Sequence, residues 1–276
     1  MTSGLSVRFW GVRGSIACPG PETIRYGGNT PCVEVRCGDR LLIFDGGTGI
    51  RPLGDALMKT GKPVNADIFF SHCHVDHVGG LPFFAPFYIK GNSFRLWAGN
   101  LLPKYRMEEI MRLLMSHPLF PIEIDVFQAA MSYRDFSAGD TLNPCPGVTL
   151  RTTPLEHPDG ATGYRLDYSG RSIAYLTDNE GRPGHIDPRV IELARGADLA
   201  IYDCTFTEEE IASKHGWGHS TWRDGLRLAD AAGVKTFCLF HHAPEHDDAF
   251  MDGIAAEATA ARPGTIVATE GVTITL

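Results

Sequence analysis

Short apolar runs bounded by glycine, proline, asparagine or aspartate recur along the chain and predict β-strands. The residues Cys37–Arg40 form a good hairpin turn between two of these runs. Strands are predicted at Val7–Trp10, Cys32–Arg36, Leu41–Phe44, Asp67–Phe70, Val148–Thr152, Gly163–Asp167, Ser172–Leu176, Asp198–Tyr202, Lys235–Phe240 and Val272–Leu276.

Other segments carry helical patterns that alternate with the strands, mainly in the second half of the chain. Helices are predicted near residues 50–59 and at Pro188–Arg195, Thr221–Ala232 and Asp248–Ala261. Strand-rich stretches mixed with strand–helix units indicate a layered α/β architecture. Neither a low-complexity linker nor an internal repeat divides the chain, so we expect one domain spanning residues 1–276.

The stretch Pro82–Asp140 is the least regular part of the pattern. Its segments Leu81–Tyr88 and His117–Pro121 are rich in aromatic residues and proline. One interpretation is a packed loop that covers an edge of the core. The other is an apolar wall or lid over a functional site, formed by residues 82–121. The pattern leaves both open.

Composition narrows the class of protein. Of the 276 residues, 43% are hydrophobic and 21% are charged, as is usual for a globular protein. The net charge of −8 argues against strong binding of nucleic acid. No apolar run reaches the ~18 residues of a membrane helix, and the N-terminal segment lacks a signal-peptide layout. The seven cysteines contain no CxxC pair, so we expect reduced thiols and a cytoplasmic protein without membrane partners.

Acidic and histidine residues follow five of the predicted strands directly. Each of these strands is followed by one potential metal ligand or proton-transfer group: His72, His157, Asp178, Asp203 and His241. In layered α/β proteins the carboxyl ends of strands share one edge, where ligands bind. We therefore expect these five side chains to converge.

The segment SHCHVDHVGG, Ser71–Gly80, concentrates three histidines and an aspartate that would cost desolvation energy if they were left unpaired. Residues at i and i+2 of an extended segment share a face, so His72 and His74 can bind one metal while Cys73 points away. Asp76 and His77 can bind a second. Two metals need a bridging carboxylate, for which Asp178 is the natural candidate. Together with His157 and His241, this nitrogen and oxygen set suits zinc, and also manganese or iron.

The motif HCHVDH at 72–77 resembles the HxHxDH signature of the metallo-β-lactamase superfamily. Thr177-Asp178, Gly218–Thr221 and Leu239–His242 resemble motifs of its phosphodiesterase branch, which includes tRNase Z and the cyclic-phosphate hydrolases. The resemblance extends from Phe9 to about Asp248. It implies a four-layer αββα sandwich and two divalent metal ions. By this resemblance the metal ligands are His72, His74 and His157 for one ion, Asp76, His77 and His241 for the other, and Asp178 as the bridge.

The resemblance also implies catalytic roles for His219, Asp203 and Asp76. A carboxylate that accepts from one imidazole nitrogen fixes the tautomer and leaves the other nitrogen for substrate, which is what Asp203 could do for His219. Alternatively, Asp203 caps the next helix and His219 lies beside a helix N-cap. Asp45 resembles a buried aspartate that supports the histidine motif, or else it is a turn former before two glycines.

These residues together predict a dinuclear metal-dependent hydrolase that acts through metal-bound hydroxide. A phosphodiester has a poor alkoxide leaving group, so an acid such as His219 favours a phosphodiesterase. The tRNA-gripping arm of tRNase Z is commonly inserted where this chain has only the segment 158–177. We therefore expect a small phosphodiester, such as a cyclic nucleotide or cyclic sugar phosphate. The alternatives are an acyl hydrolase (lactonase or thioesterase), a tRNase Z-like RNA endonuclease and a metal-binding sensor without turnover, and a homodimer is compatible with all of them.

Overall fold

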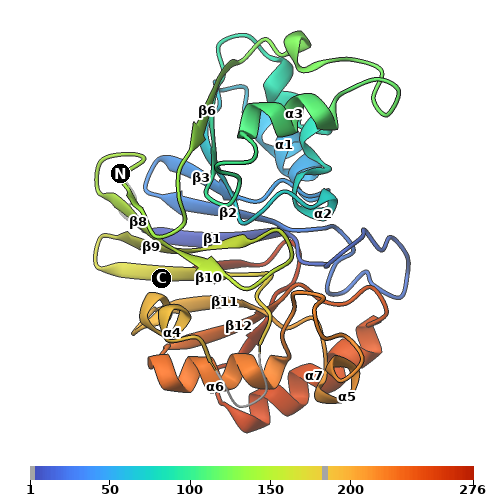
Figure 1. Ribbon diagram of the computed structural model, residues 1–276, viewed down its shortest axis with the longest axis vertical. Helices are drawn as coiled ribbons and strands as arrows, with labels where there is room; N and C mark the ends of the chain where they lie inside the picture. The colour runs from blue at the N-terminus through green and yellow to red at the C-terminus, as the bar shows by residue number, and fades with distance from the viewer. Residues whose placement is uncertain (1–3, 182–185) are drawn as a thin grey trace.

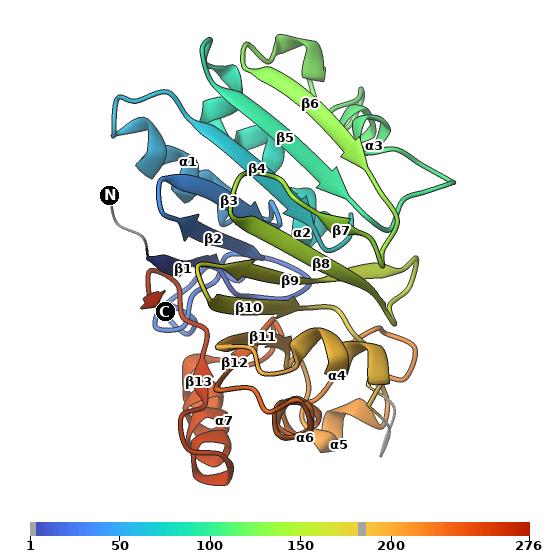
Figure 2. The same ribbon diagram turned by 90° about the vertical axis from the view of Figure 1, so that its left-hand side faces the viewer.

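Two seven-stranded mixed β-sheets pack face to face in the computed structural model, which describes residues 4–181 and 186–276 (Figures 1 and 2). The strands of the first sheet, in spatial order, are β14 (Thr273–Thr275), β1 (Leu5–Gly11), β2 (Cys32–Cys37), β3 (Arg40–Phe44), β4 (Asn65–Phe70), β5 (Ser93–Ala98) and β6 (Ala130–Asp135). Those of the second are β13 (Ile266–Val267), β12 (Thr236–Phe240), β11 (Leu199–Asp203), β10 (Arg171–Leu176), β9 (Ala161–Tyr168), β8 (Val148–Leu155) and β7 (Thr141–Leu142).

Each sheet is antiparallel on one side and parallel on the other. In the first sheet, β3 to β6 pair in parallel, whereas β14, β1, β2 and β3 pair antiparallel. In the second sheet, β10 to β13 pair in parallel, and β7 to β10 form an antiparallel meander. The parallel strands end at a common edge of their sheet, and this edge carries the loops that form the site.

Helices cover the outer face of each sheet (Figure 1). On the first sheet lie α1 (Ile50–Met58), α2 (Val75–Val78), α3 (Met107–Leu114) and the short 3₁₀ segments η1 (Leu81–Phe83), η2 (Ala85–Tyr88) and η3 (Ile124–Val126). On the second lie α4 (Pro188–Ala194), α5 (Glu208–Ile211), α6 (Trp222–Ala232) and α7 (Asp248–Ala261). Three apolar clusters fill the gaps between the resulting layers, one between the sheets and one beneath each helical layer. The predicted four-layer αββα sandwich is confirmed.

Local sequence accounts for the helix boundaries near the site. Helix α6 begins after Thr221, whose hydroxyl accepts from the backbone N–H of Asp224, and it ends at Gly233 with φ of 63°. A side-chain cap and a left-handed glycine are the usual start and stop of a helix. Helix α1 buries Ile50, Leu53 and Leu57 on one face, which presses it against the first sheet.

The stretch 82–140 is more regular than its sequence suggested. It contributes β5, β6 and α3, none of which was predicted. In β5 the buried residues Phe94, Leu96 and Ala98 alternate with half-buried ones, a period of two that identifies a strand. Phe84 and Phe87 are fully buried in the outer core, which supports the interpretation that this part packs over an edge of the core. The alternative, that residues 82–121 form a lid over the site, remains a prediction. Over the described ranges, no helix combines the length and apolar character needed to span a membrane.

Candidate metal centre

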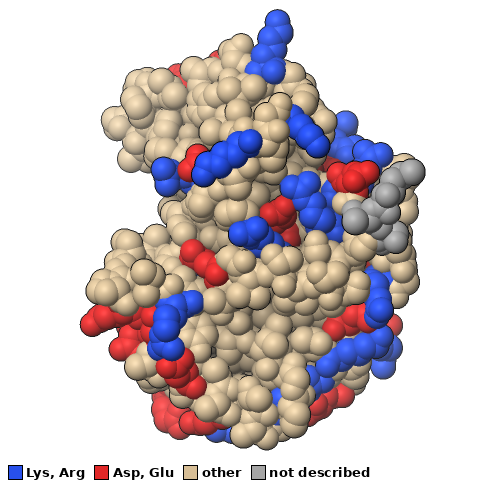
Figure 3. Space-filling view, turned by 180° about the vertical axis from the view of Figure 1, so that it is seen from behind, with Lys and Arg blue, Asp and Glu red and all other residues tan. Residues whose placement is uncertain are grey.

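The five strand ends meet at one edge of the sandwich, as expected. β4, β8, β10 and β12 end one or two residues before His72, His157, Asp178 and His241, and β11 ends on Asp203 itself. Figure 3 shows a hollow in the surface between the two halves of the molecule, at the left edge of the view. Because this view is turned by 180°, the hollow lies on the right-hand side of Figure 1, where α2 is drawn. The site thus lies between the sheets, at the mouth of this hollow.

The first group of potential ligands is His72, His74 and His157, whose nitrogens lie within 4.8 Å of one another. His157 Nε2 is 3.1 Å from His74 Nδ1. His72 and His74 lie in the segment between β4 and α2, and Cys73 between them packs against the outer core, where burial raises the pKa of its thiol to about 12. Cys73 therefore points away, as expected.

The second group is Asp76, His77 and His241. Asp76 and His77 lie on the first turn of α2, and His77 Nε2 is 3.3 Å from His241 Nε2 and 3.3 Å from Asp76 Oδ2. The backbone N–H of Ser15 donates to Asp76 Oδ2 at 2.8 Å, a contact that the sequence analysis did not predict. Burial alone would raise the pKa of Asp76, but His77 and His241 lower it. Asp76 is therefore an anion at neutral pH.

Asp178 lies between the two groups. Its Oδ2 is 3.2 Å from His77 Nε2, and its Oδ1 is 3.5 Å from His241 Nε2, 3.7 Å from His157 Nε2 and 3.8 Å from His72 Nε2. A carboxylate in this position can contact ions held by either group, which is what the predicted bridge requires.

The donor set fits divalent metal ions. His72 Nε2 is buried and has no hydrogen-bond partner among the described residues, although it faces the cluster. Burial and the neighbouring His77 lower the pKa of His72, so its lone pair is free. An unpaired buried polar atom is costly unless an ion completes it. Imidazole nitrogen with carboxylate oxygen and no thiolate suits zinc, manganese or iron.

Asp45 holds the histidine loop from behind. It is fully buried, with φ of 60°, and its Oδ2 is 2.9 Å from His77 Nδ1. Ser71 donates to Asp45 through both its N–H and its hydroxyl, each at 2.8 Å, and the Tyr175 hydroxyl donates at 2.7 Å. With its Nδ1 side engaged, His77 presents Nε2 to the cluster. Asp45 thus supports the histidine loop, beyond a role as turn former.

A backbone carbonyl orients His157. Its Nδ1 is 2.8 Å from the carbonyl oxygen of Gly218. Glu180 in turn accepts from the backbone N–H groups of Gly216 at 2.9 Å and Gly218 at 2.8 Å. The sequence analysis did not identify Glu180, although its position two residues after Asp178 placed it near the site. It named Gly218 only as the first residue of the motif Gly218–Thr221 and did not predict a role for its carbonyl.

His219 and Asp203 form a buried pair beside the cluster. His219 Nδ1 is 2.8 Å from Asp203 Oδ2 and 3.8 Å from Asp178 Oδ1. Burial alone would lower the pKa of His219, but Asp203 and then Asp178 raise it to about 9. Asp203 does not cap the next helix, because α5 is capped by Thr207. His219 lies two residues before Thr221, the cap of α6, so it is close to a helix N-cap in addition to its contact with Asp203.

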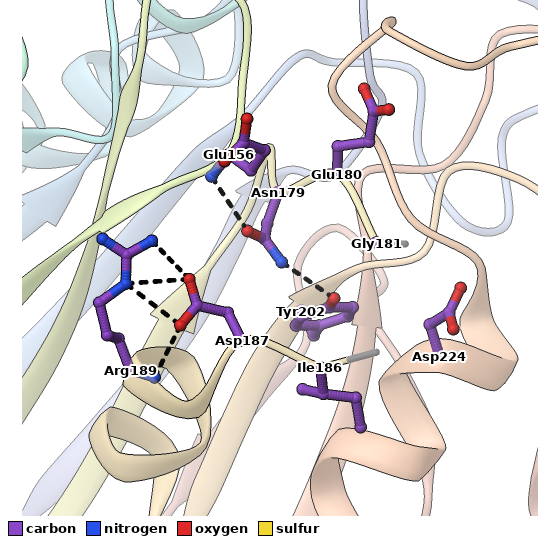
Figure 4. Close-up of a pocket in the computed structure, with 9 residues that line it drawn as sticks. All are labelled: Glu156, Asn179, Glu180, Gly181, Ile186, Asp187, Arg189, Tyr202 and Asp224. Carbon is purple, nitrogen blue, oxygen red and sulfur yellow. Dashed lines mark hydrogen bonds and ion pairs between the residues drawn. The ribbon is translucent and has the colours of Figure 1, made fainter. Parts of the chain in front are cut away.

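A cavity of about 240 Å³ adjoins the cluster (Figure 4). Glu156 and Asn179, which line it, are the neighbours of His157 and Asp178 in the chain. Asn179 bridges the two sides of the cavity, since its amide donates to the Tyr202 hydroxyl at 3.1 Å and its Oδ1 accepts from the N–H of Glu156 at 3.3 Å. Asn179 therefore helps to hold the segments of His157 and Asp178 in register.

A four-layer sandwich with a histidine and aspartate cluster at its strand ends defines a metallo-β-lactamase-fold protein. Residues 40–242 match the family model of the β-lactamase superfamily domain, and the chain belongs to this family. It is a metal-dependent hydrolase of the metallo-β-lactamase superfamily.

Relatives and solved structures agree with this assignment. A ribonuclease Z of Acaryochloris marina is 26% identical over 247 residues, covering 73% of this chain and 77% of the relative. A diphosphatase of the PhnP family has a TM-score of 0.70 at 19% identity (99% and 97% covered), and the short form of human tRNase Z has 0.69 at 19% (98% of each). Zn²⁺-bound PqqB from Methylobacterium extorquens has 0.73 at 16% (98% and 100%). At these identities the structures show the fold alone.

Proposed function

We propose that the chain is a dinuclear phosphodiesterase that hydrolyses a small phosphodiester, such as a cyclic nucleotide or a cyclic sugar phosphate. The observation that carries the phosphodiester assignment is the buried His219–Asp203 pair beside the cluster. A thioester releases a thiolate, which is a better leaving group than an alkoxide and needs a positioned acid less. The solved diphosphatase of the PhnP family has the same fold, which is compatible with phosphate chemistry.

Seven side chains would hold the two ions. They are His72, His74 and His157 for one, Asp76, His77 and His241 for the other, and Asp178 between them. Zinc is the first choice, as in the zinc-bound relative of this fold, with manganese or iron as alternatives. When bound, such ions lower the pKa of water towards ~7 and stabilise negative charge on a phosphoryl oxygen.

His219 would supply the proton for the leaving oxygen. Its Nδ1 faces Asp203, so the tautomer is fixed and Nε2 remains for substrate. Burial lowers the pKa of His219, but Asp203 raises it, and this favours the protonated form that a general acid requires. Asp203 is fully buried and also accepts from the Thr205 hydroxyl at 2.8 Å, so its carboxylate is held in place.

We infer a small substrate from the segment that connects His157 to Asp178. Between His157 and Asp178 the chain forms only the short connection 158–160 and the hairpin of β9 and β10. This region therefore has no space for an inserted arm. Figure 3 shows basic and acidic side chains interspersed on the rear face, in keeping with the net charge of −8.

The second candidate is RNA cleavage. It is favoured by the ribonuclease Z of Acaryochloris marina and by the fold of human tRNase Z. These relatives count against our expectation that nucleic acid is not a partner. RNA cleavage would use the same cluster and the same His219, so it differs from the first proposal in substrate rather than in chemistry.

The test is hydrolysis of bis(p-nitrophenyl) phosphate by protein loaded with zinc or manganese, with EDTA as control. We expect metal-dependent turnover for the wild type. On a diester that releases an alkoxide, such as a cyclic nucleotide, the His219→Ala variant should lose roughly 10²–10⁴-fold in kcat, the usual contribution of a general acid. On bis(p-nitrophenyl) phosphate, whose nitrophenolate leaves without protonation, the variant should keep most of its activity. His117→Ala, which removes an exposed histidine, is the matched control.

The proposal would be contradicted if EDTA abolished the turnover of lactones or thioesters but left the turnover of phosphodiesters unchanged. Full activity of His219→Ala on cyclic nucleotides and cyclic sugar phosphates would also contradict the proposal and would favour an acyl hydrolase. Cyclic nucleotides, cyclic sugar phosphates and precursor tRNA then separate the substrate classes. Cleavage of the tRNA in preference to every small diester would favour the second candidate.

A further inference from the structure

Trp217 lies on the loop that leads into His219, and the residue is 56% exposed. The other tryptophans, at positions 10, 97 and 222, are buried or half-buried. Large aromatic side chains that remain exposed beside a site often contact a binding partner, because they provide apolar area at a low entropic cost. The position of Trp217 is therefore unusual for this chain.

Contacts between side chains connect Trp217 to His219. The Phe206 ring lies 5.8 Å from the His219 ring, centroid to centroid. The Lys214 ammonium is 5.9 Å from the centroid of the Phe206 ring and 4.0 Å from that of Trp217. Phe206, Lys214 and Trp217 thus form a row that starts at the proposed general acid and carries one positive charge in its middle.

The backbone around Trp217 is fixed, although its side chain is exposed. The N–H groups of its two neighbours, Gly216 and Gly218, both donate to Glu180, whose side chain is only 10% exposed. The Gly218 carbonyl, in turn, lies 2.8 Å from His157 Nδ1. A ring on a backbone that is fixed in this way loses little further entropy when it binds a partner.

We propose that Trp217 determines specificity by stacking on a nucleobase carried by the phosphodiester substrate. Lys214 covers part of the ring with positive charge and attracts the anionic phosphate towards the row. This inference rests on the proposed function, which it narrows to nucleotide-like diesters. Stacking of a base on an aromatic side chain accounts for roughly 5- to 150-fold in affinity.

The kinetic test uses two substrates with the same leaving group, thymidine 5′-(p-nitrophenyl phosphate) and methyl p-nitrophenyl phosphate. Only the first carries a nucleobase. We expect Trp217→Ala to lower the ratio of their kcat/KM values by about tenfold, mainly through KM of the thymidine diester. Trp217→Phe keeps a flat ring and should restore most of the ratio. Tyr105→Ala, which truncates an exposed aromatic residue on the other half of the molecule, is the control.

A binding test does not need turnover. Tryptophan fluorescence of the zinc-loaded protein is titrated with adenosine 5′-monophosphate and with ribose 5-phosphate, which lacks the base. Neither compound is a phosphodiester. We expect quenching by the first that disappears in Trp217→Phe, and none by the second.

The outcomes separate the two proposals. Equal losses on both diesters in Trp217→Ala would overturn the stacking inference, because Trp217 would then only hold the loop. Quenching by ribose 5-phosphate to the same extent would also overturn it. Absence of turnover on both diesters by the wild type refutes the proposed function, and the fluorescence titration then decides the stacking inference independently.

Discussion

Replacing Asp45 by asparagine tests how far the cluster depends on a carboxylate outside it. Asparagine has nearly the same shape and tolerates the left-handed backbone of this position, where φ is 60°. The change therefore leaves the packing intact and alters only charge and hydrogen bonding. Four donor groups point at the Asp45 carboxylate, from Ser71 N–H, Ser71 hydroxyl, Tyr175 hydroxyl and His77 Nδ1.

The expected size of the effect follows from these four contacts. The asparagine amide nitrogen would face one of the donors, so one hydrogen bond is lost and a buried donor is left unsatisfied. The other hydrogen bonds change from charge-assisted, at about 1.5–3 kcal/mol each, to neutral ones of about 1 kcal/mol. Removing a buried charge offsets part of this. We expect the free energy of unfolding to fall by about 2–4 kcal/mol.

Metal affinity should fall as well, because Asp45 orients His77. Loss of a carboxylate that holds a metal-binding histidine typically lowers affinity 10- to 100-fold. The assays are urea unfolding of the metal-free protein and competition for zinc with a chromophoric chelator. Tyr175→Phe is the matched variant, since it removes one donor and keeps the carboxylate. It should cost about 1.5–3 kcal/mol in stability, the contribution of one charge-assisted hydrogen bond, and leave the zinc affinity nearly unchanged.

Two results would refute the reasoning. The first is an Asp45→Asn protein whose unfolding free energy lies within about 0.5 kcal/mol of the wild type, the range of an ordinary surface substitution. The second is a zinc affinity that falls equally in Asp45→Asn and Tyr175→Phe. In that case the affinity would report on general loosening of the core, rather than on the orientation of His77.

Two further variants probe the surroundings of the cluster. His242 donates from Nε2 to the Ala268 carbonyl, and burial lowers its pKa to about 3. As the pH falls below ~6.5, the histidine is protonated in the unfolded chain but not in the folded one, so the free energy of unfolding decreases. We expect His242→Gln to flatten the decline in urea midpoint of metal-free protein from pH 7 to 4, and an unchanged decline would contradict this. Glu180→Gln should lower zinc affinity through Gly218 and His157, because the new amide opposes one N–H group. Competition with a chelator measures the zinc affinity of this variant. An affinity equal to that of the wild type would contradict the proposed connection between Glu180 and His157.

The parts of the fold that could be predicted were those with strong local signals. The apolar runs before His72, Asp178 and His241 identified buried strands, and the rule that parallel strands end at one edge brought the distant residues together. Helices α6 and α7 were predicted at nearly their observed boundaries, since α6 begins at a capping threonine and ends at a glycine. These features depend on residues close in sequence.

The strands β5 and β6 were missed because their signals are mixed. In β5 the polar positions include Arg95 and Trp97, which both donate to Asp67 of the neighbouring strand β4, at 2.6 and 2.8 Å. A strand whose second face carries a half-buried ion pair and an indole does not show a simple alternation of apolar and polar residues. The alternation of Phe94, Leu96 and Ala98 was the signal that could have identified it.

The groups that orient the proposed ligands divide by the kind of contact they make. Asp45 meets His77 through side chains, so its residue type already indicated a partner for a histidine. By contrast, Gly218 orients His157 through its carbonyl, and its φ of 85° suits glycine, which carries no chemical group to suggest a role. Glu180 acts on backbone N–H groups, which every residue except proline offers. Contacts of this kind depend on the path of a loop, and that path is set by tertiary packing, so only a structure can reveal them.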